Sequence, residues 1–191
     1  MNAVCRIIAG PNGAGKTTFA LKYLPLVAPG TAFVNADLIA AGLSPLAPEQ
    51  KLVAASRLFL QQIEQHVADG RNFAFETTLS GRGYLRLVRR LRSAGWRVEL
   101  IYLALPDVTL SRLRVAERVA HGGHSIGEAD IVRRFPRSLQ NLLGVYGSVV
   151  DHTRCFLNSG AAPEIVFIQD GNRRTILNQV VFDQLVREAH S

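Results

Sequence analysis

The sequence predicts an α/β fold in which a parallel central sheet carries helices on both faces. Strand and helix signals alternate along all 191 residues, which is the pattern of parallel strands joined by helical crossovers. A glycine-rich loop over residues 10–17 separates the first strand signal from the first helix signal. Repeats, linkers and low-complexity stretches are absent from the sequence, so we expect one domain over residues 1–191.

The first half of the chain holds three expected strands and three expected helices. Residues 4–9, 31–35 and 72–76 are short runs, mostly apolar, that are typical of buried strands. The helices are expected from Thr18 onwards, over 49–68 and over 81–94, and Gly95 is placed to end the third.

The second half continues the alternation. Residues 97–105 give the longest strand signal, and a helix over 108–119 follows Pro106-Asp107. Ser125 and Glu128 have the spacing of a capping box, which predicts a helix from there to about residue 146. The last strands are expected over 153–157 and 165–168, and a closing helix over 175–188.

The glycine-rich loop matches the phosphate-binding pattern G-x-x-x-x-G-K-[ST], in the strand–loop–helix context that it requires. Its glycines let the backbone wrap a phosphate closely, and the following helix adds its positive N-terminal end. We expect Lys16 to contact the β- and γ-phosphates of ATP and the Thr17 hydroxyl to be a ligand of Mg²⁺. The fold class is therefore that of the P-loop NTPases and kinases. The expected ATP-binding residues are Gly10, Pro11, Asn12, Gly13, Ala14, Gly15, Lys16, Thr17 and Thr18, with Asn158 bordering the adenine by analogy with related kinases.

Composition favours a globular protein without a membrane segment. The chain is 48% hydrophobic and 19% charged, which is ordinary for soluble domains. No apolar run approaches the roughly 18–20 residues that span a bilayer, and residues 1–10 run into the first strand without a signal peptide. We expect a cytoplasmic protein in which Cys5 and Cys155 are buried free thiols.

The formal net charge is +7, and 19 of the 22 basic residues are arginine. Arginine suits bidentate contacts with phosphate groups. This balance fits either a nucleic-acid partner or a pocket for phosphorylated small molecules. No nucleic-acid motif and no aromatic–basic repeat favours the first, so a nucleic-acid partner is not expected.

Two carboxylates are expected at the carboxyl edge of the sheet, where α/β proteins bind their ligands. Asp37 lies in an otherwise apolar stretch and is the candidate base for an accepting hydroxyl; the alternative is that it caps a helix starting near Leu38. Glu76 ends an apolar strand and is expected to bind the acceptor or to reach the metal through water. Its alternative is a carboxylate that pairs with an arginine.

Four further residues complete the expected acceptor site: Asn35, Thr77, Thr78 and Arg82. The threonines offer hydroxyls for a sugar or a phosphate, whereas a strand-ending asparagine is commonly a turn residue. Arg82 and Arg86 lie at helical spacing beside Glu76 and are candidates for the acceptor's phosphates. The alternative for this arginine stripe is a solvated helix face.

Six arginines flank Gly122-Gly123: Arg112, Arg114, Arg118, Arg133, Arg134 and Arg137. They predict a small helical lid over about 112–137 that closes over ATP, with the two glycines as its hinge. Arg118 and then Arg134 are the candidates to stabilise charge on the transferring phosphoryl group. His121 and His124 are expected to be turn or hydrogen-bonding residues, because no third metal ligand stands nearby in the sequence.

With these motifs placed, the sequence resembles the zeta-toxin family, and more closely the short single-domain zeta-toxin-like proteins of bacteria. The resemblance extends from Ile7 to about Ser159 and rests on the phosphate loop and on residues 35–37, 75–81 and 118–124. It implies a P-loop kinase that uses ATP and Mg²⁺ to phosphorylate a hydroxyl of UDP-N-acetylglucosamine or a similar sugar nucleotide. It also implies that Asp37 is the base, that lid arginines contact ATP, and that an antitoxin protein is a partner.

The leading hypothesis is therefore a small-molecule kinase, and two others stand beside it. A kinase of nucleic-acid ends is compatible with the positive charge and predicts oligonucleotide binding that weakens steeply with salt. A nucleotide-binding interaction module, held by an antitoxin, would use ATP to govern partner binding instead of transfer. Asp37 separates this last hypothesis from the kinases, because a switch without an acceptor needs no base.

Overall fold

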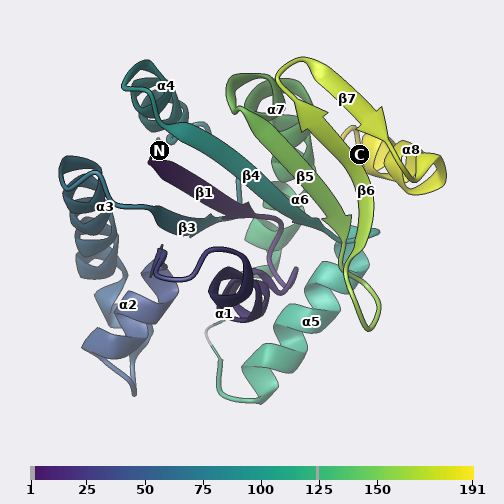
Figure 1. Cartoon of the computed structure of the whole chain (residues 1–191). Coiled ribbons are helices and arrows are strands. Elements are labelled where there is room, and N and C mark those ends of the chain that lie inside the picture. The colour runs from purple at the N-terminus through teal and green to yellow at the C-terminus, as the bar shows by residue number, and fades with distance from the viewer. Residues whose placement is uncertain (1–2, 124) are drawn as a thin grey trace.

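The computed structural model, which describes residues 3–123 and 125–191, contains a seven-stranded sheet in the order β2-β3-β1-β4-β5-β6-β7 (Figure 1). The strands are β1 (Val4–Ala9), β2 (Ala32–Val34), β3 (Phe73–Thr77), β4 (Arg97–Ala104), β5 (His152–Leu157), β6 (Glu164–Asp170) and β7 (Arg173–Ile176). β2, β3, β1, β4 and β5 are parallel neighbours, whereas β6 and β7 pair antiparallel at one edge. The expected α/β fold with a mainly parallel sheet is confirmed.

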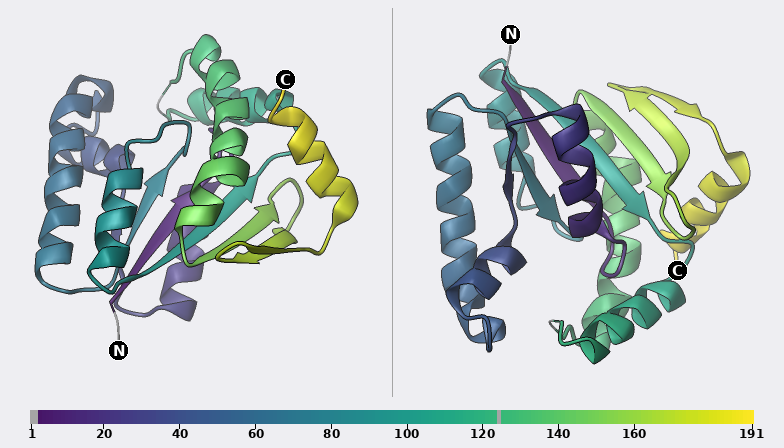
Figure 2. Two further views of the ribbon diagram at one scale, coloured as in Figure 1. Left: turned by 90° about the horizontal axis from the view of Figure 1, so that it is seen from above. Right: turned by 60° about the horizontal axis from the view of Figure 1, so that its bottom comes forward.

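Helices cover both faces of this sheet (Figure 2). They are α1 (Lys16–Val27), α2 (Ala36–Leu43), the 3₁₀ turn η1 (Pro48–Lys51), α3 (Leu52–Ala68), α4 (Leu85–Ser93), α5 (Val108–Ala120), α6 (Glu128–Asn141), the π-helical turn η2 (Leu142–Tyr146), α7 (Gly147–Val149) and α8 (Gln179–Glu188). Buried side chains of α3, α4, α6 and α8 pack on one face, and those of α1 pack on the other. Among the described residues, none of the helices is long and apolar enough to cross a membrane.

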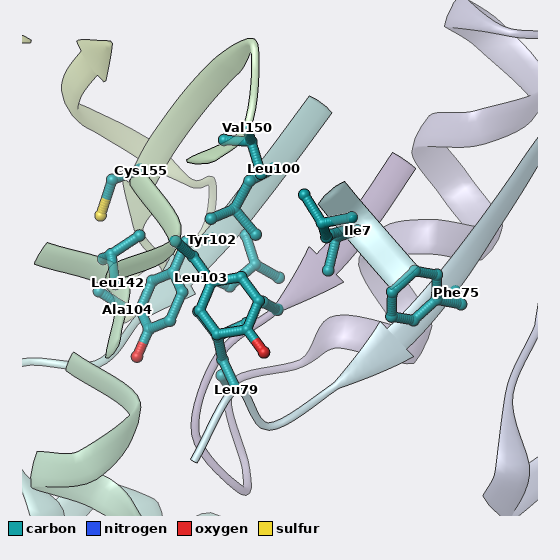
Figure 3. Close-up of a cluster of buried hydrophobic side chains, with 14 of the residues drawn as sticks. Ile7, Phe75, Leu79, Leu100, Tyr102, Leu103, Ala104, Leu142, Val150 and Cys155 are labelled. Carbon is teal, nitrogen blue, oxygen red and sulfur yellow. The ribbon is translucent and has the colours of Figure 1, made fainter. Parts of the chain in front are cut away.

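The main core lies between the sheet and helices α3, α4, α6 and α8, and Figure 3 shows part of it. Every residue of β4 after Arg97 is buried, because this central strand is covered on both faces. Tyr102 is fully buried, and its hydroxyl is 2.7 Å from Ser138 Oγ on α6, so its polar end is satisfied. The cysteines in the described part of the chain, Cys5 and Cys155, are free and buried as expected, and burial raises the pKa of both thiols.

The largest differences in element boundaries from the sequence prediction occur at three places. The helix expected from residue 81 begins at Leu85, because Gly81 and Gly83 have low helix propensity and occupy a turn. Ser125 does not cap α6, which starts at Glu128 after Gly127. The closing helix, expected from residue 175, begins at Gln179, because residues 173–176 form β7 and pair with β6 across the tight turn at Gly171.

Candidate active site

The glycine-rich loop lies between β1 and α1, at the carboxyl edge of the sheet that the right panel of Figure 2 brings forward. Gly10, Gly13 and Gly15 have φ values of 148°, 74° and 77°. A Cβ atom at Gly10 would lie 2.2 Å from the Leu103 carbonyl oxygen, so only glycine fits there. Since Gly15 precedes α1 and has no side chain to cap it, the first N–H groups of the helix can serve an anion.

Lys16 is hydrogen-bonded to the phosphate loop and lies near other charged side chains. Its side chain is buried, and Nζ donates a hydrogen bond to the Pro11 carbonyl oxygen at 3.0 Å and lies 3.7 Å from Glu76 Oε1. Burial lowers the pKa of Lys16, the charges of Glu76 and Asp37 raise it, and that of Arg118 lowers it. Two carboxylates and a second cation therefore lie close enough to act on this ammonium group.

Through hydrogen bonds, Glu76 connects the ends of β2 and β3 with the start of α1. Its Oε2 atom accepts hydrogen bonds from Thr17 Oγ1 at 2.7 Å and from Asn35 Nδ2 at 2.6 Å. Asn35 Oδ1 in turn accepts the backbone N–H groups of Asp37 and Leu38, at 2.8 and 3.0 Å. Asn35 is therefore the N-cap of α2, and the alternative in which Asp37 caps this helix is wrong.

A polar cavity of about 230 Å³ opens over these residues. It is lined by Asn12, Gly13, Lys16, Thr17, Asn35, Ala36, Asp37, Glu76, Thr77, Thr78, Tyr84 and Arg118. The structure thus brings together Asp37, Glu76 and both threonines, which the sequence places on two separate strand ends. We refer to this space as the inner cavity.

The loop after β3 (residues 78–81) is held in place by hydrogen bonds from α6. The Thr78 carbonyl oxygen accepts a hydrogen bond from Ser138 Oγ at 2.5 Å, and the Leu79 carbonyl oxygen accepts one from Asn141 Nδ2 at 2.8 Å. Leu79 has φ of 59° and is buried in the core beside Tyr102 (Figure 3), a backbone conformation that leucine adopts only under constraint. The polar residues of α6 were missed in the sequence, although Ser138 and Asn141 interrupt an apolar helix face.

A larger cavity of about 780 Å³ is bordered by the phosphate loop, α1, α5 and the segment after β5, and we refer to it as the outer cavity. It is lined by Gly13, Gly15, Thr18, Phe19, Lys22, Tyr23, Leu26, Arg114, Glu117, Arg118, His121, Asn158, Ala161 and Pro163. Asn158 donates from Nδ2 to the Ala14 carbonyl oxygen at 2.8 Å, which ties the end of β5 to the loop. Gly13 and Arg118 line both cavities, so the two spaces meet at the phosphate loop.

The six arginines of the expected lid have different positions. Arg118 is exposed at the end of α5 and lines both cavities. Arg114 donates to the Asn158 carbonyl oxygen at 2.7 Å and lines the outer cavity. Arg112 pairs with Glu128, whereas Arg133 and Arg137 are exposed on α6. Of these arginines, the structure brings Arg118 and Arg114 to the two cavities.

Arg134 and Arg82 are not among the described residues that line either cavity. Arg134 pairs with Asp130 at 3.0 Å on its own helix. Arg82 lies in the turn before α4 and donates to Asn141 Oδ1 at 3.2 Å, so it does not share a helix face with Arg86.

The glycine pair has two distinct local roles. Gly122 has φ of 82° and follows the end of α5, whereas the Gly123 N–H donates to the Arg118 carbonyl oxygen at 2.9 Å. His121 Nδ1 lies 2.7 Å from the Glu117 carbonyl oxygen, which agrees with a local hydrogen-bonding role, and His124 lies outside the described residues. Among the described residues, no group of three His, Cys, Asp or Glu side chains is arranged to hold a metal ion.

The chain matches a known protein family over most of its length. A family model described as "AAA domain" matches residues 6–141, which is more than half of the chain. An uncharacterized protein of Haemophilus influenzae is 32% identical over 131 residues, covering 65% of this chain and 86% of that protein.

Solved structures share the fold at low sequence identity. A chain of the AvrRxo1-ORF1:-ORF2 complex with ATP has a TM-score of 0.70 and 17% identity over 97% of this chain, which spans only 63% of that chain's length. The PezAT toxin-antitoxin system of Streptococcus pneumoniae gives a TM-score of 0.66 and 14% identity, covering 99% of this chain and 85% of that one. A gluconokinase of Sinorhizobium meliloti gives 0.51 and 13%, covering 99% and 94%. The chain therefore has a P-loop kinase-like fold.

Proposed function

The chain belongs to the AAA domain family, and from that premise we propose that it is a kinase that transfers the γ-phosphoryl group of ATP to a hydroxyl of a small molecule. The observation that carries this proposal is the inner cavity, where Lys16, Arg118 and Asp37 converge beside the phosphate loop. Phosphoryl transfer needs positive charge on the moving group, alignment, and a residue that orients or deprotonates the acceptor. The inner cavity offers each of these, and the outer cavity adjoins it through Gly13 and Arg118.

ATP is the proposed donor and Mg²⁺ the proposed metal. The outer cavity has room for a nucleoside, and the positive-φ glycines and the start of α1 suit its phosphates. Mg²⁺ prefers oxygen ligands and is commonly held by one or two protein groups plus substrate phosphates, which fits the Thr17 hydroxyl with Glu76 behind it. When bound, the metal would neutralise charge on the phosphates. The ATP complex of the AvrRxo1 neighbour supports this assignment.

The chain's own residues would have separate roles in the reaction. The acceptor oxygen forms a bond to the γ-phosphorus, the bond from that phosphorus to the β–γ bridging oxygen breaks, and ADP leaves. Asp37 takes the proton of the acceptor hydroxyl. Lys16 and Arg118 stabilise the negative charge on the transferring group, the first from the loop and the second from the end of α5. Glu76 holds the Thr17 hydroxyl and the start of α2 in position.

Finer assignments in this proposal derive from the sequence resemblance. UDP-N-acetylglucosamine is the first sugar nucleotide to test as an acceptor, and the cytoplasm is the proposed compartment. An antitoxin-like protein is a proposed partner, which the PezAT toxin-antitoxin neighbour supports. Co-purification of the chain with the product of an adjacent gene would test the partner directly.

The substitution Asp37→Asn tests the proposal, because it removes the proton acceptor at nearly constant shape. We expect phosphoryl transfer to fall by roughly 10²–10⁴-fold, with ATP affinity little changed. Transfer is measured with γ-labelled ATP across a metabolite panel, and ATP affinity by calorimetry. Equal transfer by the variant and the parent would refute the role of Asp37, and a loss of ATP binding would reassign this carboxylate to the metal.

A further inference from the structure

We propose that the acceptor is an uncharged polyhydroxyl compound of about monosaccharide size, bound against the loop after β3, and that it carries no phosphate of its own. This inference rests on the proposed kinase function and specifies its substrate class, and it sets a neutral acceptor against the sugar nucleotide that the sequence resemblance implies. It follows from the charge, the hydrogen-bonding groups and the size of the inner cavity.

The charges that line the inner cavity leave no cation for a phosphate on the acceptor. Among its described lining residues the cations are Lys16 and Arg118. Lys16 is directed to the phosphate loop by its bond to Pro11, and Arg118 stands where this cavity meets the outer one. The facing charged groups are the carboxylates of Asp37 and Glu76. A second phosphate would therefore meet like charges at short range, which is strongly unfavourable away from bulk water.

The neutral groups in the same lining suit hydroxyls. Thr77 and Thr78 line the cavity, and the Thr78 hydroxyl, which lies 3.0 Å from Ser80 Oγ outside the lining, can both donate and accept. Asn12 is 7% exposed, and its Oδ1 atom has no hydrogen-bond partner among the described residues. A buried oxygen without a partner is costly unless a ligand supplies a donor. Burial raises the pKa of Tyr84, so its hydroxyl stays protonated and can donate as well.

The loop that carries Thr78 is held in one conformation. α6 fixes the Thr78 and Leu79 carbonyl groups through Ser138 and Asn141, and the Leu79 side chain is 1% exposed. The strained φ of Leu79 is tolerated because these contacts determine it. Hydroxyls placed on such a fixed backbone select a ligand by the positions of its own hydroxyls.

The arginines that the sequence offered for acceptor phosphates lie elsewhere. Arg82 donates to Asn141, and neither it nor Arg86 is among the described residues that line the cavity. The cavity volume of about 230 Å³ is below the roughly 300–1,000 Å³ that is typical of ligand pockets. The transferring phosphate takes part of this space, so the remainder suits a group of at most monosaccharide size, and the diphosphate and base of a sugar nucleotide would have to lie outside it.

The test compares matched acceptors with γ-labelled ATP and Mg²⁺. Neutral polyols and monosaccharides are assayed against their phosphate esters, against UDP-N-acetylglucosamine and against 5′-hydroxyl oligonucleotides, with ATP binding measured separately. We expect kcat/KM for at least one neutral acceptor to exceed that of its phosphate ester by tenfold or more. Preference for a phosphate ester or a sugar nucleotide would overturn this inference and leave the small-molecule kinase standing, whereas preference for an oligonucleotide would overturn the small-molecule acceptor as well. Binding of ATP with transfer to none of them would overturn both.

A variant then places the neutral acceptor on the loop. Thr78→Val removes one hydroxyl at constant shape, and the loss of one neutral hydrogen bond predicts a rise of roughly 2- to 12-fold in the KM of the acceptor. The KM of ATP should stay as in the parent. Thr175→Val makes the same chemical change on the edge strand β7 and should alter neither constant. An unchanged acceptor KM in Thr78→Val would overturn the placement on this loop.

Discussion

Gly123 is expected to position Arg118, and replacing it by alanine tests this. A Cβ atom at residue 123 would lie 2.5 Å from Arg118 Cγ, 3.3 Å from its Cδ and 2.9 Å from its carbonyl oxygen. Real Cβ atoms essentially never approach a neighbour closer than 3.0 Å. Gly123→Ala therefore displaces the stem of the arginine that lines both cavities.

The magnitude follows from that distance. Restoring an ordinary carbon–carbon contact of about 3.5–4.0 Å requires the Arg118 stem to move by about 1 Å or more. A misplacement of about 1 Å at a group that stabilises the transition state can cost roughly 100-fold in rate. We expect kcat to fall by about that factor in Gly123→Ala, with the KM of ATP changed much less. Steady-state kinetics with the preferred acceptor measures both constants.

Gly122→Ala is the matched comparison. A Cβ atom there would meet nothing within 4 Å, but φ is 82°, so alanine costs roughly 1–2 kcal/mol in stability. Its kcat should stay within a few-fold of the parent, while its thermal midpoint falls. If both variants lose kcat equally, the glycine pair acts as a hinge and the positioning of Arg118 by Gly123 is refuted.

Lys16, Asn35 and the two buried cysteines each provide a further test. Lys16→Ala should abolish transfer and weaken ATP binding while the protein stays folded, measured by labelled-ATP assay and circular dichroism. Asn35→Ala should lower the free energy of unfolding by roughly 2–4 kcal/mol, through loss of the α2 cap and of the bond to Glu76. Asn35→Asp keeps the cap but sets a second carboxylate against Glu76, so urea titration should find it less stable than the parent. Burial raises the pKa of Cys5 and Cys155, so above pH 9.0 the unfolded state loses thiol protons that the folded state keeps. The thermal midpoint should therefore fall as pH rises above 9.0, and it should fall less steeply in the variant with both cysteines replaced by alanine.

The fold and the nucleotide side of the site could be predicted from the sequence because their signals are local. The phosphate loop needs glycine at fixed offsets, and β1 before it and α1 after it are adjacent in the chain. Buried strands read as apolar runs, so the central strands were placed to within a few residues. β7 was missed because a four-residue edge strand with two arginines carries no such run.

The acceptor side of the site could not be predicted from the sequence, because its geometry depends on residues that lie far away in the chain. The shape of the loop after β3 comes from Ser138 and Asn141, about 60 residues later in the chain. Arg82 was expected to begin a stripe of arginines along one helix face and to contact the acceptor. The glycines on either side of it instead place it in the turn before α4. Arg134 is directed by Asp130, a partner one helical turn away on the same helix.

Asn35 shows how the fold and the site depend on the same atoms. Its Oδ1 atom caps α2, which fixes the backbone of Asp37, and its Nδ2 atom bonds the Glu76 oxygen that also accepts the Thr17 hydroxyl. A serine or aspartate could cap the helix equally well, but neither offers a side-chain N–H pair to a carboxylate. The requirement to serve a helix and a carboxylate at once therefore explains an asparagine at this strand end. It also fixes the proposed base relative to the phosphate loop before any ligand binds.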